Sequence, residues 1–117
     1  GCYNGRYYFV CTYLFYFLID KYIAWYSKAN TLRELQRYDE AIAVYNKSLE
    51  INSEFHWVWY RKATCYLRKY DNSKALENLS KAIELNSEKM HQNAKMDKYW
   101  EVVRDSEEFK KLIEEYI

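Results

Sequence analysis

The segment from residue 55 to residue 70 holds the densest set of side chains that could recognise a charged ligand. It contains Arg61, Lys62, Arg68 and Lys69 together with six aromatic residues and no acid. Basic side chains interleaved with rings bind single-stranded nucleic acid through phosphate pairing and base stacking. The same side chains attract an acidic peptide or a terminal carboxylate. A helix turns successive residues to different sides, so these charges do not share one face, and a mixed, solvated surface is the third interpretation.

Residues suited to catalysis or metal binding are scarce. The only histidines, His56 and His91, belong to no H-E-x-x-H motif, and no cysteine–histidine group has zinc spacing. Glycine is absent after Gly5, so the chain contains neither a glycine-rich phosphate loop nor a G-x-S-x-G turn. Glutamate pairs at 107–108 and 114–115 are expected on solvated helix faces. The sequence therefore predicts a protein that is not an enzyme and holds no cofactor or metal.

The cysteine pattern indicates whether the protein resides in a reducing or an oxidising compartment. Cys2, Cys11 and Cys65 form no C-x-x-C pair, and an odd number of cysteines cannot complete a set of disulfides. We expect three reduced thiols that pack as small apolar residues. A reducing compartment such as the cytoplasm is the predicted location.

The composition of the 117 residues favours helices. The chain has no proline and only two glycines, whereas tight hairpin turns require glycine. Half of the residues are hydrophobic and 20% are aromatic, so a dense core is expected, in one small domain or in a piece of a longer array. The formal net charge of +1 argues against a dedicated nucleic-acid binder, which carries a strong positive excess.

Near the N-terminus, residues 7–19 form an uncharged run, YYFVCTYLFYFLI. A membrane-spanning helix needs about 20 apolar residues, and this run is shorter and partly polar. A signal peptide would need a basic leader and a small-residue cleavage site, which are missing. We expect a buried helix; an interface with a missing neighbour and a membrane-associated helix are the alternatives. Because the sequence does not begin with methionine, we also expect a fragment of a longer protein.

The second half of the chain repeats the first at a fixed spacing. Residues 24–54 aligned with residues 58–88 give ten identities in 31 positions. The identities include two W-Y-x-K-A motifs, which begin at Trp25 and Trp59, and an N-S-E motif at the end of each copy. A period this long indicates stacked helical units, since one unit cannot bury its apolar face without a neighbour.

Apolar residues recur at helical spacing within each copy. Ala41 and Ala75 lie in the middle of the facing sides, where small residues let two helices approach closely. Predicted N-caps are Asn52-Ser53 for the third helix, Asp71 or Asn72 for the fourth and Asn86-Ser87 for the fifth. The last helix is amphipathic, with an apolar stripe of Phe109, Leu112, Ile113 and Tyr116. The predicted helices cover residues 24–35, 38–51, 55–69, 72–85, 87–96, 98–103 and 106–116.

These residues resemble the tetratricopeptide repeat, a 34-residue motif that reads W-x2-L-G-x2-Y, then A-x3-F and a closing P. Trp25 and Trp59 match its first aromatic residue, and Ala41 and Ala75 match its central alanine. Serine replaces the closing proline in both copies, and lysine replaces the leucine. The resemblance implies an all-α fold, a right-handed α-solenoid of antiparallel helix pairs with a closing helical element.

The resemblance also divides the chain into four segments. Residues 1–22 form an aromatic N-terminal helix, interpreted as a degenerate or truncated repeat. Residues 23–55 and 56–88 are the two repeats. Residues 89–117 form the C-terminal capping helices, which close the stack with a charged outer face.

In repeats of this family the first helix of each pair lines a concave groove, so the resemblance implies a site for a protein segment. In this interpretation Tyr26, Trp57 and Tyr60 anchor the segment, and Arg33 and Arg68 recognise acidic or carbonyl groups. The alternative is that the tyrosines pack between helices. The predicted groove residues are Tyr26, Asn30, Arg33, Trp57, Tyr60, Thr64, Arg68, His91 and Lys95.

The sequence thus predicts a non-catalytic protein–protein interaction module that binds a peptide segment, with an acidic peptide as one option. The alternative is a structural module that self-associates through residues 7–19. RNA binding by a helical repeat is a third hypothesis, which the near-neutral net charge disfavours. Neither a nucleic acid nor a membrane is an expected partner.

Overall fold

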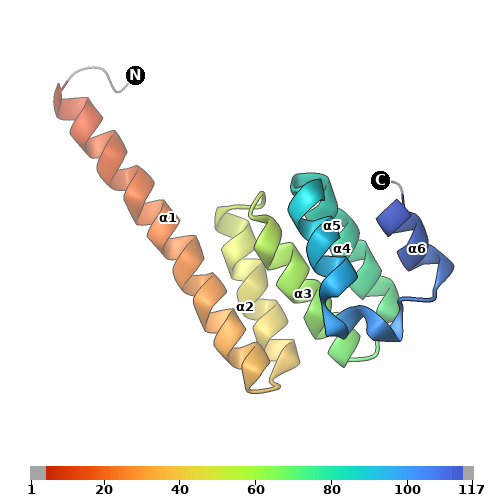
Figure 1. The fold of residues 1–117 in the computed structure, drawn as a ribbon. Coiled ribbons are helices and arrows are strands. Elements are labelled where there is room, and N and C mark those ends of the chain that lie inside the picture. The colour runs from red at the N-terminus through yellow and green to blue at the C-terminus, as the bar shows by residue number, and fades with distance from the viewer. Residues whose placement is uncertain (1–4, 115–117) are drawn as a thin grey trace.

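Helices account for nearly the whole chain in the computed structural model (Figure 1). The structure describes the backbone of residues 5–114, and side chains at Thr12, Leu14, Tyr16, Phe17 and residues 20–114. Within this part of the chain there is no β-strand, so the predicted all-α fold is confirmed. The elements are α1 (Gly5–Glu34), α2 (Tyr38–Ile51), α3 (His56–Arg68), α4 (Asn72–Leu85), α5 (Ser87–Met96), the 3-10 helix η1 (Lys98–Val102) and α6 (Glu107–Glu114).

The period of the sequence is also a period of the structure. The shift that carries Trp25 onto Trp59 also carries the first and last residues of α2 onto those of α4. It likewise carries the end of α1, at Glu34, onto the end of α3, at Arg68. Two helical hairpins of the same plan, α1–α2 and α3–α4, therefore stand side by side in the stack (Figure 1).

The turn inside each hairpin has the same unusual backbone. Gln36 and Tyr70 have φ of 62° and 63°, in the left-handed region that glycine adopts without steric cost. The N–H of the residue that follows each of them donates back to a carbonyl in the last turn of the helix, at Leu32 and Tyr66 respectively. This is the Schellman arrangement, which satisfies the last helical carbonyls. A non-glycine residue in it costs about 1 kcal/mol in backbone strain.

Trp25 and Trp59, the first residues of the repeated motif, share part of their surroundings, although Lys47 also lies over Trp25 and the Trp59 Nε1 atom donates to the Ser53 carbonyl. Both rings are half-buried, and each lies under the lysine three positions later in the helix. The Lys28 Nζ atom is 5.4 Å from the centroid of Trp25, and the Lys62 Nζ atom is 5.2 Å from that of Trp59. The lysines that replace leucine in the motif therefore cover the rings with their aliphatic stems and cations.

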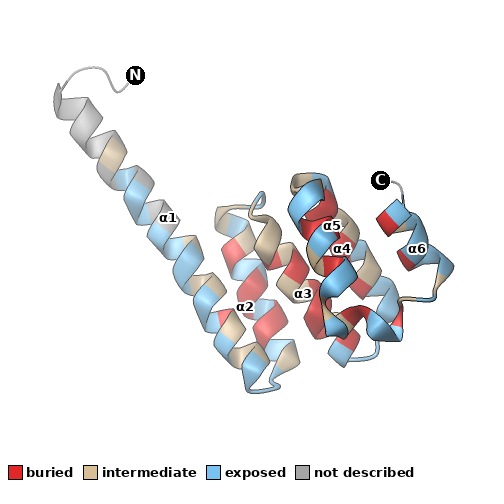
Figure 2. Cartoon of the chain, viewed as in Figure 1, coloured by how far each residue is buried: buried red, intermediate tan, exposed pale blue. Residues whose placement is uncertain are grey.

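Small residues lie where the helices of a hairpin cross, as predicted. Ala41 and Ala75 are fully buried, and so are Ala29 and Ala63 on the opposing helices. One buried cluster joins α1, α2 and α3, and a second joins α3, α4, α5, η1 and α6. Tyr66 packs against both clusters, so the core runs without a gap from α1 to α6. Figure 2 shows the buried residues concentrated on helices α2 to α5.

Helix α1 is longer than the sequence predicted. It continues without a break from Gly5 to Glu34, because no proline or glycine follows Gly5 to end it. At 1.5 Å per residue α1 is about 45 Å long and α2 about 21 Å, so the N-terminal half of α1 extends past the bundle (Figure 1). The boundary expected between residues 22 and 23 thus lies inside one helix.

The expectation of a buried helix over residues 7–19 is wrong for the large side chains that the structure describes there. Leu14, Tyr16 and Phe17 are 53%, 61% and 54% exposed. The first helical pair is already complete through the α1–α2 contact near Tyr22, whose carbonyl accepts a 2.8 Å hydrogen bond from the Ser48 hydroxyl. Among the described residues, no helix is long and apolar enough to cross a membrane.

The predicted N-caps are right at two of three junctions. The carboxylate of Asp71 accepts from the N–H of Lys74 at the start of α4, and the amide of Asn86 accepts from the N–H of Lys89 at the start of α5. The third prediction is wrong, because α3 begins at His56 with Phe55 before it and no side-chain cap. The Asn52 amide instead accepts from the Glu54 N–H within the loop.

The C-terminal segment closes the stack. The expected short helix is η1, and the expected last helix is α6. Phe109 and Ile113 are buried on one face of α6, and the ring of Phe109 stacks on Trp100 with centroids 5.9 Å apart. The charged residues of α6 face outward, as predicted, whereas Tyr116 of the predicted stripe lies outside the described residues.

Candidate functional site

The nine predicted groove residues lie on α1, α3 and α5, the first helix of each unit, but they do not form one accessible surface. On α1, the Tyr26 ring packs against Phe55 and Tyr45, with centroids 5.0 Å and 6.1 Å away. The Asn30 amide oxygen accepts a hydrogen bond from the Tyr45 hydroxyl. Tyr26 and Asn30 are therefore largely engaged by the core between α1, α2 and α3.

Tyr60 and Thr64, two predicted groove residues of α3, lie in the interior. Tyr60 is 1% exposed; its hydroxyl donates to Asp97 Oδ2 at 2.8 Å and accepts from Trp100 Nε1 at 3.1 Å. Burial and the hydrogen bond to Asp97 raise the pKa of Tyr60. Thr64 is fully buried, and its hydroxyl donates to the backbone carbonyl of Arg61. Neither side chain is available to a partner, and at Tyr60 it is η1, returning across α3, that covers the ring through Trp100.

Of the two predicted groove residues on α5, His91 is buried and Lys95 is exposed. His91 is 7% exposed, and its Nε2 atom contacts the carbonyl oxygen of Ile113 in α6. The α6 helix packs on α5 and buries this histidine, which the sequence had placed in the groove. Lys95 is exposed near the end of α5.

Trp57 stands half-buried on α3 among positive charges. The Arg61 Cζ atom is 5.4 Å and the Lys89 Nζ atom is 5.6 Å from its ring centroid. The ring of Tyr60 meets it edge-on at 5.8 Å. Burial, and then the charge of Lys89, lower the pKa of the adjacent His56. The histidine is therefore held neutral near pH 7, and the cations here are Arg61 and Lys89.

Three arginines, Arg33, Arg61 and Arg68, carry positive charges without a carboxylate partner. Within the described residues, the ion pairs involve other cations, in Arg37–Glu40, Lys69–Asp39 and Lys81–Glu84. The Nε atoms of Arg33 and Arg61 are buried and have no hydrogen-bond acceptor. Both guanidinium groups lie close enough to Tyr45 to oppose the rise of its pKa that burial causes. These three arginines therefore have no ion pair within the described residues, although Glu34 lies at the same pocket as Arg33 and Arg68.

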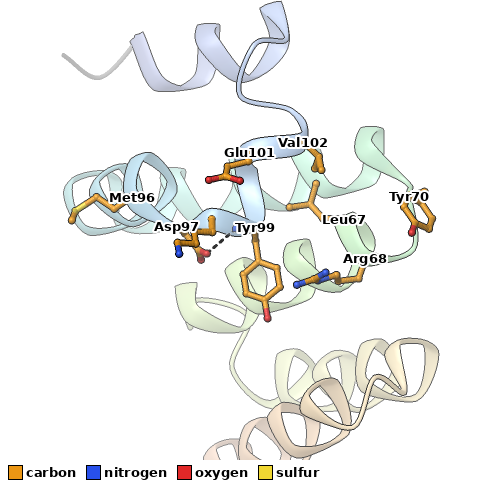
Figure 3. Close-up of a pocket in the computed structure, with 9 residues that line it drawn as sticks. Leu67, Arg68, Tyr70, Met96, Asp97, Tyr99, Glu101 and Val102 are labelled. Carbon is orange, nitrogen blue, oxygen red and sulfur yellow. Dashed lines mark hydrogen bonds between the residues drawn. The ribbon is translucent and has the colours of Figure 1, made fainter.

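Two adjacent pockets lie beside Arg33 and Arg68. We call the first the α1–α3 pocket; it has a volume of about 420 Å³, and Arg33, Glu34, Tyr38 and Arg68 line it. The second, the α3–η1 pocket, has a volume of about 760 Å³ and is lined in part by Leu67, Met96 and Val102 (Figure 3). Arg68, Tyr70 and Tyr99 line both pockets, so the two pockets are adjacent.

Tyr99 positions Arg68 between the two pockets. The Arg68 Cζ atom is 4.6 Å from the ring centroid of Tyr99, and Figure 3 shows the guanidinium group directed toward that ring. The backbone N–H of Tyr99 donates to Asp97 Oδ1, while the other oxygen of Asp97 accepts from Tyr60. The Asp97 carboxylate thus attaches the C-terminal tail, residues 97–114, to α3. It also holds Tyr99 beside Arg68.

Sequence reasoning missed Tyr70 and Tyr99 as site residues and left Arg61 out of the predicted groove. Arg61 could have been added from the basic segment 55–70, in which it was already noted. Tyr99 lies in the predicted short helix, residues 98–103. No pattern in the neighbouring sequence indicates that this helix packs back against α3. Among the described residues, no group of histidine, cysteine, aspartate and glutamate is arranged to hold a metal ion.

Comparison with protein-family models identifies two matching segments. Residues 22–55 and residues 58–89 each match a tetratricopeptide repeat model. The two segments together cover more than half of the chain: the first spans the C-terminal part of α1 with α2, and the second spans most of α3 with α4 and the start of α5. A comparison with curated proteins found no matching relative.

Proposed function

Because the chain belongs to the tetratricopeptide repeat family, whose repeats generally mediate protein–protein interactions, we propose that it is a non-catalytic module that binds an acidic peptide segment of a partner protein. The segment docks on the surface that comprises Arg33, Trp57, Arg61, Arg68 and Tyr99, which we call the arginine face. Of the residues predicted from sequence, Lys95 extends this positive surface at α5. Tyr60 supports it from the interior through Asp97, which also holds Tyr99, whereas Thr64 and His91 are buried and are not part of it.

The observation that carries the proposal is the set of three arginines that have no carboxylate partner among the described residues. An arginine that has no carboxylate partner in its own chain can form a charge-assisted hydrogen bond with a carboxylate of a bound segment. Arg61 lies over Trp57 and Arg68 over Tyr99, so the cations are pre-oriented by rings rather than neutralised. An acidic segment supplies the missing charge, and the exposed ring edges supply contact area.

The proposal is tested by selecting ligands from a displayed library of random short peptides. The selected peptides should carry an excess of aspartate and glutamate over the unselected library. In a fluorescence titration with the strongest selected peptide, Arg33→Glu and Arg68→Glu should each weaken binding at least about tenfold, or about 1.4 kcal/mol. The affinity should fall as salt is added, because the charges are partly exposed.

A charge-matched control separates recognition from general attraction. Lys110→Glu changes the net charge by the same amount on the exposed face of α6, away from the arginine face, and should leave the affinity unchanged. Selected peptides without an acidic excess, or an equal loss from Lys110→Glu, would contradict the proposal. Tighter, salt-dependent binding of mixed single-stranded RNA would favour the nucleic-acid hypothesis instead.

A second candidate function is self-association through the N-terminal half of α1. It is favoured by the exposure of Leu14 and Phe17 and by the absence of charge over residues 7–19. Exposed apolar side chains gain free energy when a second copy of the chain covers them.

Sedimentation velocity over a range of protein concentrations tests self-association. The sedimentation coefficient should rise with concentration, and the double variant Leu14→Lys, Phe17→Lys should abolish the rise. Leu35→Lys, which adds a charge at another exposed apolar residue outside this helix, should not abolish it. A monomer at the highest concentration would exclude this function and leave the peptide-binding proposal intact.

A reducing compartment is part of the same proposal. The thiol of Cys65 is free and fully buried, which supports its role as a packing residue. Cys2 and Cys11 lie outside the side chains that the structure describes.

A further inference from the structure

The α3–η1 pocket is surrounded by apolar side chains that the protein leaves in water. Tyr70 is 91% exposed, Met96 84% and Val102 71%. These residues come from the α3–α4 turn, the end of α5 and η1, and they surround one depression of about 760 Å³ (Figure 3). Leu67, which also lines the pocket, is 5% exposed. Because these side chains are so exposed, the depression is open to solvent and can cover one side of a bound group.

Tyr70 contributes nothing visible to the stability of the fold. Its φ of 63° is the left-handed conformation that favours glycine or asparagine. Its ring makes little contact with the rest of the chain, since nine-tenths of the residue is exposed. A bulky residue that bears backbone strain and gains no burial in return is a candidate for contact with a partner. Tyrosine is also a residue type enriched at the energetic centres of interfaces.

The charges around the pocket restrict what it accepts. Arg68 lies at the junction with the α1–α3 pocket, and no carboxylate of the described chain pairs with it. Asp97 also lines the pocket, but its two oxygens already accept from Tyr60 and Tyr99. Lys98 and Glu101 at the pocket bring opposite charges. The lining thus carries both signs of charge, and Arg68 is a cation beside the apolar wall that has no ion pair with a carboxylate of the described residues.

We propose that the α3–η1 pocket receives one bulky apolar side chain of the partner's acidic segment, with Tyr70 and Val102 against that side chain and Arg68 paired with a neighbouring carboxylate. This inference rests on the proposed function and deepens it, because it names the residue pattern of the segment: a leucine or aromatic anchor with aspartate or glutamate close on one side. Tyr99 is a positioning residue in this arrangement, since it holds the guanidinium group of Arg68 between the two pockets.

The test compares two synthetic peptides of equal length and charge. Both carry several glutamates; one has a central phenylalanine and the other has serine at that position. Wild-type protein should bind the phenylalanine peptide at least about tenfold more tightly in a fluorescence anisotropy titration, as burial of an aromatic side chain requires. Tyr70→Gly and Val102→Asp should each reduce this ratio toward one.

Tyr70→Gly has a second readout that a structural role would not produce. Because glycine tolerates positive φ, the variant should melt about 3 °C higher than wild type while its preference for phenylalanine falls. Gln36→Gly, at the equivalent backbone position of the first hairpin, should show the same increase in melting temperature. Leu35→Ala removes an exposed apolar side chain outside both pockets and should keep the wild-type ratio.

The outcomes separate the two levels of the proposal. If both acidic peptides bind wild type equally well, the anchor pocket is wrong and the peptide-binding function stands. If neither acidic peptide binds, the proposed function fails and the anchor pocket fails with it. A Tyr70→Gly protein that keeps the full preference for phenylalanine, or that melts at a lower temperature than wild type, would also overturn the anchor assignment.

Discussion

Tyr26 and Tyr60 occupy equivalent positions in the two repeats, yet their environments differ. The Tyr26 ring packs beside Phe55, half-buried. Tyr60 is enclosed by the C-terminal tail, and its hydroxyl joins the side chains of Asp97 and Trp100. One residue type in one repeat position can therefore serve as a packing group or as the attachment point of another segment. The neighbour that the chain brings to it decides which.

The hydroxyl of Tyr60 should contribute measurably to stability. Tyr60→Phe leaves the buried Trp100 Nε1 without an acceptor and Asp97 Oδ2 without a donor, so the free energy of unfolding should fall by about 1–3 kcal/mol. Urea denaturation followed by tryptophan fluorescence measures the change. Tyr99→Phe is the control, because the Tyr99 hydroxyl has no hydrogen bond within the described chain. An equal loss of unfolding free energy in both variants would show that the hydrogen bonds of the Tyr60 hydroxyl do not stabilise the fold.

The thiol of Cys65 should be nearly inert in the native protein. Burial raises its pKa to about 12, so at pH 8 only about one molecule in ten thousand carries the reactive thiolate. In a variant with Cys2→Ser and Cys11→Ser, alkylation of Cys65 should be slow until urea unfolds the chain. Because the thiolate is the reactive form and the native pKa is raised, the rate of alkylation of the folded protein should keep increasing with pH above the ordinary pKa of a cysteine. Rapid alkylation of the folded protein at pH 8 would contradict the burial of this residue.

At the scale of elements, each hairpin turn is built from backbone hydrogen bonds that end one helix and start the next. Asp71 follows the left-handed residue of the second turn and caps α4, whereas Arg37 holds that place in the first turn and provides no side-chain cap for α2. Asp39 and Glu40 in the first turn of α2 interact favourably with the helix dipole instead.

The cap of α4 gives a matched test within one turn. Asp71→Ala should lower the free energy of unfolding by about 1 kcal/mol, because the Lys74 N–H loses its acceptor. Asn72→Ala, at the next position, should change it by less than about 0.5 kcal/mol. Thermal unfolding followed by circular dichroism compares the two variants. A larger effect at Asn72 would place the cap later in the chain than the structure has it.

At the scale of the molecule, the two ends of the chain have opposite relations to the core. The tail folds back, and Trp100, Phe109 and Ile113 complete the second buried cluster. The N-terminal half of α1 extends away from the bundle (Figure 1). This extension gives the molecule principal dimensions of 56, 34 and 19 Å. Stability should therefore depend on the tail far more than on the extension.

Truncations at the two ends measure this asymmetry. Deletion of residues 1–17 should leave the melting temperature at low protein concentration within about 2 °C of wild type, because the large side chains described there are exposed. Deletion of residues 107–117 should unfold or strongly destabilise the protein, since it uncovers Trp100 and removes Phe109 and Ile113. A folded, stable protein without α6 would show that the second cluster does not need it.

Sequence reasoning recovered most of the local architecture. The helices from residue 38 to residue 96 were predicted to within one residue at each end, and Ala41 and Ala75 were placed correctly at the helix crossings. Internal repetition made this possible, because a position that is apolar or small in both copies is expected to have the same packing role in each. The cap of α3 was misplaced, since Asn52 is an equally good partner for its own loop.

The sequence by itself determined the repeat, its helices and the small residues on which they cross, because these follow from spacing along the chain. Only the tertiary structure decided which groove residues are accessible. The C-terminal segment crosses α3 and buries Tyr60, and α6 covers His91, through contacts between residues about 20 to 40 positions apart. Periodicity records which face of a helix is apolar, but it does not record which distant segment of the chain will cover that face.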